Sequence, residues 1–271
     1  MGTFAYPYPG RSAGAGGADS EDFIVFGGNL HTCSTRWNGS SWAATSAMIC
    51  ARYYLGGSGT SNSTAAVGGY NGSAYAGKHE IWDGTNWTAA GSLNDARYET
   101  CGGGTTNAGI AAGGHTGTGP AGTTCHEQFN GSVWLEAASS LNTKKQHGST
   151  SNGTQNDFSV FAGSPASALT ENYNGVQWTE GPNMIQQRYA PVGAGTPTAG
   201  IVFGGHNGTG YVACTEEYTG TEVNLATYTC TLSSAWSSGG AMITAGAGYG
   251  ARAGIQNAYA HMVTVADTDS H

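Results

Sequence analysis

The sequence has few charged residues and no long apolar run. Charged residues make up only 10% of its 271 residues, nine Lys or Arg against 17 Asp or Glu, which gives a net charge of −8. No run of basic residues is longer than Lys144-Lys145. Phosphate backbones are bound by clustered cations, so nucleic acid is not expected as a ligand. The best apolar run, Phe23 to Phe26, falls far short of the roughly 18 residues of a membrane span, so membrane insertion is not expected either.

The N-terminal residues and the overall composition point to different compartments. Met1 to Pro9 show neither the basic segment nor the apolar segment of a secretory signal, which predicts synthesis in a cytoplasm. The 46 glycines, with abundant Ser, Thr and Asn, are more typical of proteins that work outside cells. A virion component that folds inside a host and is released by lysis meets both observations. An extracellular protein is the alternative.

A five-residue pattern of Asn or Asp, Gly, two further residues and Trp recurs along the chain. Its tryptophans are Trp42, Trp87, Trp134 and Trp178, and a degenerate fifth copy ends at Val223. The period is about 45 residues, the length of a repeated supersecondary unit. Asn-Gly and Asp-Gly favour tight hairpin turns because glycine adopts positive φ angles without strain.

Two further markers keep the phase of the tryptophans. A basic residue follows each Trp by ten positions, at Arg52, Arg97, Lys144 and Arg188. A pair of small residues later ends an apolar run, as at Gly68-Gly69. Each unit therefore predicts four short antiparallel strands, the last two joined by the Asn-Gly turn. Four such strands per repeat form one blade of a β-propeller.

This arrangement resembles the kelch-repeat family of β-propellers, whose units carry Gly-Gly after the second strand and an aromatic residue and a Trp around the next turn. The resemblance covers roughly residues 11 to 223. Phrases such as Ser92 to Arg97 and Thr215 to Gly220 look like the kelch-type arrays of tailed phages of marine bacteria, cyanophages included. That resemblance implies a virion-associated or adhesin role.

The chain length sets the expected number of blades. At about 45 residues per repeat, 271 residues predict an all-β, six-bladed propeller in a single domain. The expected repeats are 11–51, 52–96, 97–143, 144–187, 188–232, and 233–271 completed by 1–10, whose strand would close the ring. Five blades with free termini are the alternative.

Acidic and cysteine residues also recur in register. Glu80, Glu127, Glu171 and Glu216 each lie four residues before the turn glycine, and we expect each to pair with a repeat arginine in a structural role, because a buried carboxylate needs a partner. Cys33, Cys125 and Cys214 share another register and are expected to be buried thiols that are not bonded to one another. If a disulfide forms, Cys214 with Cys230 is the best pair.

The start of each innermost strand offers a candidate binding ring. Its members are Arg52-Tyr53, Arg97-Tyr98 and Arg188-Tyr189, with Lys144-Lys145 as a fourth variant. Aromatic rings beside cations suit contacts with carbohydrate or protein. The structural alternative is that the arginines bind between blades while the tyrosines pack locally.

Catalytic and metal sites are not expected. The histidine pairs His79 with His126 and His115 with His206 occupy matched repeat positions, which would hold them apart rather than bring them together around an ion. The six cysteines show no zinc-type spacing. No cofactor is therefore predicted. Kelch-type copper oxidases are a remote enzymatic alternative.

The expected function is that of a non-enzymatic virion structural protein of a tailed phage. It would be a decoration or tail-attached subunit, present in several copies, bound to other virion proteins and contacting a host-surface glycan or protein. A carbohydrate-binding surface lectin and a protein-interaction propeller are the alternatives.

Overall fold

A computed structural model describes residues 14–17, 22–117, 122–145 and 150–218, which are built from β-strands and connecting loops without a helix. Within this part of the chain, therefore, no helix is long and apolar enough to span a membrane. The strands form five antiparallel sheets in which sequence neighbours pair. Each sheet falls inside one of the predicted repeats.

The strands of the five blades have the following bounds. Blade 1 contains β1 (Gly14–Gly17), β2 (Phe23–Phe26), β3 (Ser34–Trp37) and β4 (Trp42–Ala44), and blade 2 contains β5 (Gly56–Thr60), β6 (Ser63–Val67), β7 (His79–Trp82) and β8 (Trp87–Ala90). Blade 3 contains β9 (Cys101–Gly104), β10 (Gly109–Ala112), β11 (His126–Phe129) and β12 (Trp134–Glu136). Blade 4 contains β13 (Thr150–Thr154), β14 (Asp157–Phe161), β15 (Thr170–Tyr173) and β16 (Trp178–Gly181), and blade 5 contains β17 (Val192–Thr196), β18 (Ala199–Phe203) and β19 (Thr215–Tyr218).

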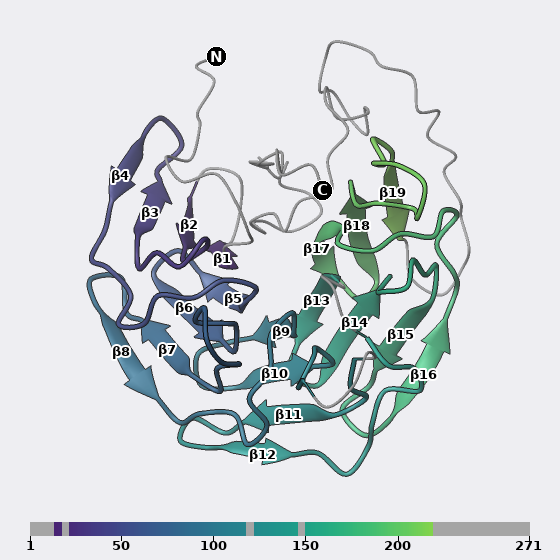
Figure 1. Cartoon of the computed structure of the whole chain (residues 1–271), viewed down its shortest axis with the longest axis horizontal. Coiled ribbons are helices and arrows are strands. Elements are labelled where there is room, and N and C mark those ends of the chain that lie inside the picture. Colours follow the sequence, from purple (N-terminus) through teal and green to yellow (C-terminus); the bar gives the residue numbers. More distant parts are fainter. Residues whose placement is uncertain (1–13, 18–21, 118–121, 146–149, 219–271) are drawn as a thin grey trace.

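The sheets are arranged around a common centre as the blades of a β-propeller, with β1, β5, β9, β13 and β17 innermost (Figure 1). The described residues form five blades of four or three strands, not six. The six-bladed prediction is thus corrected, and the five-bladed alternative agrees with the structure. Residues 233–271 and 1–10, which were expected to complete a sixth blade, lie outside the described residues.

The innermost strands are rich in glycine because neighbouring blades approach at backbone distance. A Cβ atom added to Gly56 of β5 would lie 3.0 Å from the carbonyl oxygen of Thr100, beside β9. At Gly103 of β9, an added Cβ would lie well inside van der Waals contact with the ring of Phe158 from blade 4. The glycines therefore allow the blades to pack closely at the centre.

The apolar core lies between adjacent blades. One cluster joins Ile24 and Phe26 of blade 1 to Trp82 and Trp87 of blade 2. Equivalent clusters join blade 2 to blade 3 around Trp134, and blade 3 to blade 4 around Trp178. The repeated tryptophan begins the fourth strand of blades 1 to 4, as predicted. In blades 2, 3 and 4 its indole packs against the preceding blade. Each interface therefore depends on residues from two repeats.

The first two residues of the turn before each tryptophan, Asn or Asp and then Gly, have different roles. Gly39 has a φ of 86°, and Gly84, Gly131 and Gly175 have values close to it. At the first of these turns, Asn38 Oδ1 accepts hydrogen bonds from the backbone N–H groups of Ser40 and Ser41. Glycine supplies the backbone angle, while the Asn or Asp side chain satisfies the turn amides.

Candidate functional site

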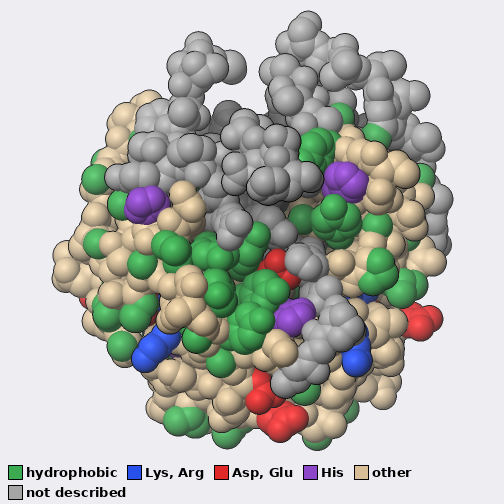
Figure 2. Space-filling view, in the orientation of Figure 1, with side chains coloured by type: hydrophobic (Ala, Val, Ile, Leu, Met, Phe, Trp, Pro, Cys, Tyr) green, Lys and Arg blue, Asp and Glu red, His purple; other side chains and the backbone are tan. Residues whose placement is uncertain are grey.

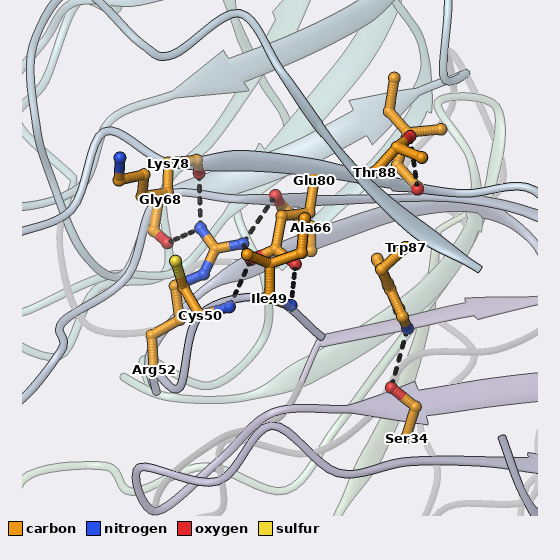
Figure 3. Close-up of polar contacts among 11 residues, drawn as sticks. Ser34, Ile49, Cys50, Arg52, Ala66, Gly68, Lys78, Glu80, Trp87 and Thr88 are labelled. Carbon is orange, nitrogen blue, oxygen red and sulfur yellow. Dashed lines mark hydrogen bonds and ion pairs between the residues drawn. The ribbon is translucent and has the colours of Figure 1, made fainter. Parts of the chain in front are cut away.

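The buried cation of each repeat pairs with the recurrent glutamate. In blade 2, Arg52 Nη2 lies 2.8 Å from Glu80 Oε1, and its Nη1 donates to the carbonyl oxygens of Gly68 and Lys78 (Figure 3). Both charged side chains are buried, at 0% and 2% exposure. The remaining glutamates pair with Arg97, Lys145 and Arg188 in the pairs Glu127–Arg97, Glu171–Lys145 and Glu216–Arg188.

The predicted role of the glutamates agrees with this geometry, with one correction. In blade 4 the cation that faces Glu171 is Lys145, whereas Lys144 is exposed. The ten-residue spacing from the tryptophan predicts Lys144 as the cation of this repeat. The linker after Trp134 is one residue longer than its counterparts, so the residue that reaches Glu171 is Lys145. The ammonium lies 3.9 Å from the carboxylate and also donates to the Ala162 carbonyl, so it meets the same kind of partners as the arginines.

The same carboxylates fasten the linker between blades. Glu80 accepts the backbone N–H groups of Ile49 and Cys50, two residues of the loop that leads from β4 into blade 2. Glu127 accepts those of Asn94 and Asp95 at the next linker. A carboxylate that is buried and fully engaged in this way is an anchor for the chain and is not free to act as a catalytic base.

Burial also decides what the arginines can do. Desolvation lowers the pKa of Arg52, and the charge of Glu80 opposes that shift. Arg52, Arg97 and Arg188 are each fully buried and have no surface to offer a ligand. The arginine half of the predicted binding ring is therefore not open to a ligand: these cations lie within the blades and pair with the recurrent glutamates, as the glutamate pattern predicts.

The tryptophans and histidines form a second repeated contact, between blades. Trp134 Nε1 donates to His79 Nδ1 over 3.2 Å, and Trp178 Nε1 donates to His126 Nδ1 over 3.1 Å. In the first interface, Ser34 Oγ takes the histidine's place and accepts from Trp87 Nε1 (Figure 3). These histidines are therefore hydrogen-bonded core residues. Within the described ranges, no three His, Cys, Asp or Glu side chains are grouped so that they could hold a metal ion.

Both histidines are held in the neutral form. Burial lowers the pKa of His79 to about 4, and the nearby charge of Arg52 acts in the same direction. Burial likewise lowers the pKa of His126 to about 4, with a further contribution from Arg97. An imidazole that accepts an indole N–H at Nδ1 must carry its proton at Nε2, so protonation at Nδ1 would break the contact between the blades.

The cysteines differ in part from their prediction. Cys33 and Cys125 are free, as expected, but half-buried rather than buried, because each lies just before a third strand instead of within it. Cys50 and Cys101 likewise form no disulfide, and Cys101 is buried. Cys214 is disulfide-bonded. Cys230, its expected partner, lies outside the described residues.

The predicted tyrosines, unlike the arginines, belong to surface clusters. Tyr53 forms a β-bridge with Tyr70, Tyr98 with His115, and Tyr189 with His206. In each pair the first residue follows the buried arginine and the second follows Gly-Gly. The sequence pattern marked His115 and His206 as matched positions, but it did not join to them Tyr70, the residue that follows Gly-Gly in blade 2.

In blades 2 and 3 these residues merge into one group, which we call the tyrosine cluster: Tyr53, Tyr54, Tyr70, Tyr75 and Tyr98, with His115 at its edge. The five tyrosine rings contact one another in a closed cycle, with centroids 4.7 to 5.7 Å apart. Four of the five rings are half-buried, and only Tyr53 is fully buried. Figure 2 shows hydrophobic-class side chains, among which tyrosine is counted, gathered near the centre of one face with a histidine beside them.

The cluster is aromatic, and its rings pack closely against one another. Tyr75 and Tyr98 stack nearly in parallel, with 8° between their planes. Burial raises the pKa of Tyr98 to about 12, with Glu99 as a further contributor, so its hydroxyl stays protonated. Such a surface can stack a flat apolar face and donate hydrogen bonds from tyrosine hydroxyls.

A comparison of the chain with models of known protein families finds no match. A search of curated proteins also finds none. The β-propeller arrangement is therefore shown by the structure itself, and the kelch-like and phage relationships remain predictions from the repeat pattern.

Proposed function

We propose that this protein is a non-enzymatic attachment propeller, a structural component of a tailed-phage particle that contacts the host surface through the tyrosine cluster. The cluster carries the proposal because it combines packed aromatic rings with solvent access. Rings that already contact one another lose little conformational freedom on binding, which favours recognition. The repeated carboxylates support a non-enzymatic role, since each is engaged by a cation and by backbone N–H groups.

The phage setting rests on the resemblance of the repeats to kelch-type arrays of marine tailed phages. In that setting the partners are other virion proteins on one side and a host glycan or protein on the other. A decoration or tail-attached position agrees with a chain whose described part consists of propeller blades. A surface lectin outside any virion is the second candidate, because half-exposed tyrosines also suit the apolar faces of sugar rings.

Two measurements test this proposal. The first is mass spectrometry of purified phage particles with quantification of copies per particle. Recovery at a fixed copy number supports the virion role, whereas complete particles without the protein would overturn it and favour the lectin.

The second measurement is binding of the labelled protein to a glycan array. We compare the wild type with Tyr70→Ser, which removes a central ring of the cluster, and with Val176→Ser as the matched control. Val176 is 77% exposed on a hairpin of blade 4, outside the cluster. Loss of binding in the Tyr70 variant alone supports the assigned surface. Equal binding by all three proteins would show that the tyrosine cluster is not the contact.

A further inference from the structure

Two loops of the propeller have five-residue sequences that differ at one position, and they share the same local geometry. Blade 3 contains Gly-Gly-His-Thr-Gly at 113–117, and blade 5 contains Gly-Gly-His-Asn-Gly at 204–208. In both loops the histidine Nδ1 accepts the backbone N–H of the last glycine over 2.9 Å. Both final glycines have positive φ, 80° at Gly117 and 98° at Gly208. The two loops are therefore equivalent platforms.

In blade 3 this platform is occupied by an aromatic side chain from the preceding blade. A Cβ atom added to Gly117 would overlap the ring of Tyr75, so the ring lies directly on the glycine. The same ring stacks on Tyr98 with centroids 5.0 Å apart and lies 5.9 Å from His115. The corresponding glycine of blade 2 is also covered, since an added Cβ at Gly72 would lie 3.0 Å from Leu30 of blade 1.

In blade 5 the platform is open toward solvent. No described atom lies within 4 Å of a Cβ added at Gly208, and Gly208 itself is exposed. The preceding loop, the connection 162–169 between β14 and β15 of blade 4, places no side chain over this glycine. It is shorter than the connection 68–78 that delivers Tyr75, but length alone does not decide the difference, since the connection 27–33 of blade 1 is shorter still and delivers Leu30. The loop of blade 4 contains no aromatic residue that could reach across.

The open platform is bordered by two further rings. His206 and Tyr211 are perpendicular, with 89° between their planes and centroids 5.3 Å apart, so they form a corner beside the glycine. Tyr211 is 53% exposed. The loop is fixed by its own hydrogen bonds, including two from backbone N–H groups to Asn207 Oδ1. No charged residue occurs in 204–212, which favours a neutral occupant.

We propose that blade 5 carries a subsite for an aromatic side chain of a partner protein, seated on Gly208 and bordered by His206 and Tyr211. A protein partner is favoured because the same position is filled by a protein side chain in blades 2 and 3, in each case from a neighbouring loop. The partner would supply the side-chain contact that the loop of blade 4 does not make. This subsite is separate from the tyrosine cluster, and its test does not depend on the cluster.

The test is an NMR titration of the full chain with N-acetyl-L-tyrosinamide. A ring that lies over a glycine shifts its Hα resonances upfield, and Gly117 under Tyr75 gives the internal reference for that effect in the free protein. We expect a saturable upfield shift at Gly208 in the direction of the Gly117 resonances. The Tyr211→Ser variant should raise Kd by about two- to tenfold, the range expected for the loss of one aromatic contact. Val176→Ser should leave Kd unchanged.

Two control probes decide between the possible occupants. N-acetylglycinamide lacks a ring and should not shift Gly208. Methyl α-D-glucopyranoside tests a sugar face. Absence of a saturable shift with the tyrosine probe, or an equal shift with the ringless probe, would overturn the proposal. A shift with the glucoside alone would also overturn it and assign the subsite to a glycan. Because Tyr211 is exposed, its variant is expected to fold, and an unchanged amide spectrum away from blade 5 verifies this.

Discussion

The neutral, buried histidines predict that the propeller loses stability in mild acid. His79 and His126 each have a folded-state pKa of about 4, against about 6.5 for an unperturbed histidine. Between these values the unfolded chain binds protons that the folded chain excludes. The free energy of unfolding therefore falls as the pH falls from about 7 toward 4, and it rises again as the pH is raised.

The size of the effect follows from the two pKa values. At pH 5 each histidine should cost about 2 kcal/mol relative to pH 8, so the pair should cost about 4 kcal/mol. That is a large part of the roughly 5–15 kcal/mol by which domains are stable. For a chain of this size, it corresponds to a fall in Tm on the order of 10 °C.

The assay is urea unfolding at pH 8, 7, 6 and 5, followed by tryptophan fluorescence. The wild type is compared with the double variant His79→Asn and His126→Asn, because Asn Oδ1 can accept the indole N–H but does not titrate. The double variant should lose most of the pH dependence even if its stability at pH 8 is lower. Val176→Ser, at an exposed residue of blade 4 that does not titrate, should keep the wild-type slope. An identical slope in the double variant and the wild type would refute the reasoning.

Three further predictions follow from packing, charge and thiol state. Glu80→Gln leaves Arg52 without a counter-charge, so it should lower the free energy of unfolding, measured in urea, by about 3–5 kcal/mol. Asp22→Asn removes a charge from a pair that is about one-third exposed and should lower it by under about 1 kcal/mol. Equal losses in the two variants would contradict the role of burial. Gly103→Ala should cost about 1–3 kcal/mol because its methyl group meets the buried ring of Phe158, and a neutral effect on Tm would disprove close packing of the blades there. Thiol titration of the six cysteines should find four reactive groups in urea and six after reduction, because Cys214 is disulfide-bonded; six without reductant would exclude the disulfide.

Much of this fold could be predicted from the sequence because it depends on the chemistry of neighbouring residues. The turn glycines and the tryptophans mark the third and fourth strands of each blade, because few residues tolerate the turn angles and few side chains fill the space between blades. The pairing of the glutamates with repeat cations was predictable for a similar reason. A carboxylate such as Glu80, on the buried face of a strand, must find a cation or leave the core, and the only cation in phase was Arg52.

Other features depended on three-dimensional packing. The number of blades depends on how far each blade rotates about the centre, which the sequence period does not encode, and division of length by period gave six where the described residues form five. Lys145 rather than Lys144 enters the core because the linker must span a fixed gap between blades. The tyrosine cluster and the open platform at Gly208 were hidden for the same reason: each depends on which loops meet across a blade boundary. What the sequence by itself determined was the composition of each blade, because that follows from contacts within one repeat, whereas the surfaces available for binding were decided only by the contacts between repeats.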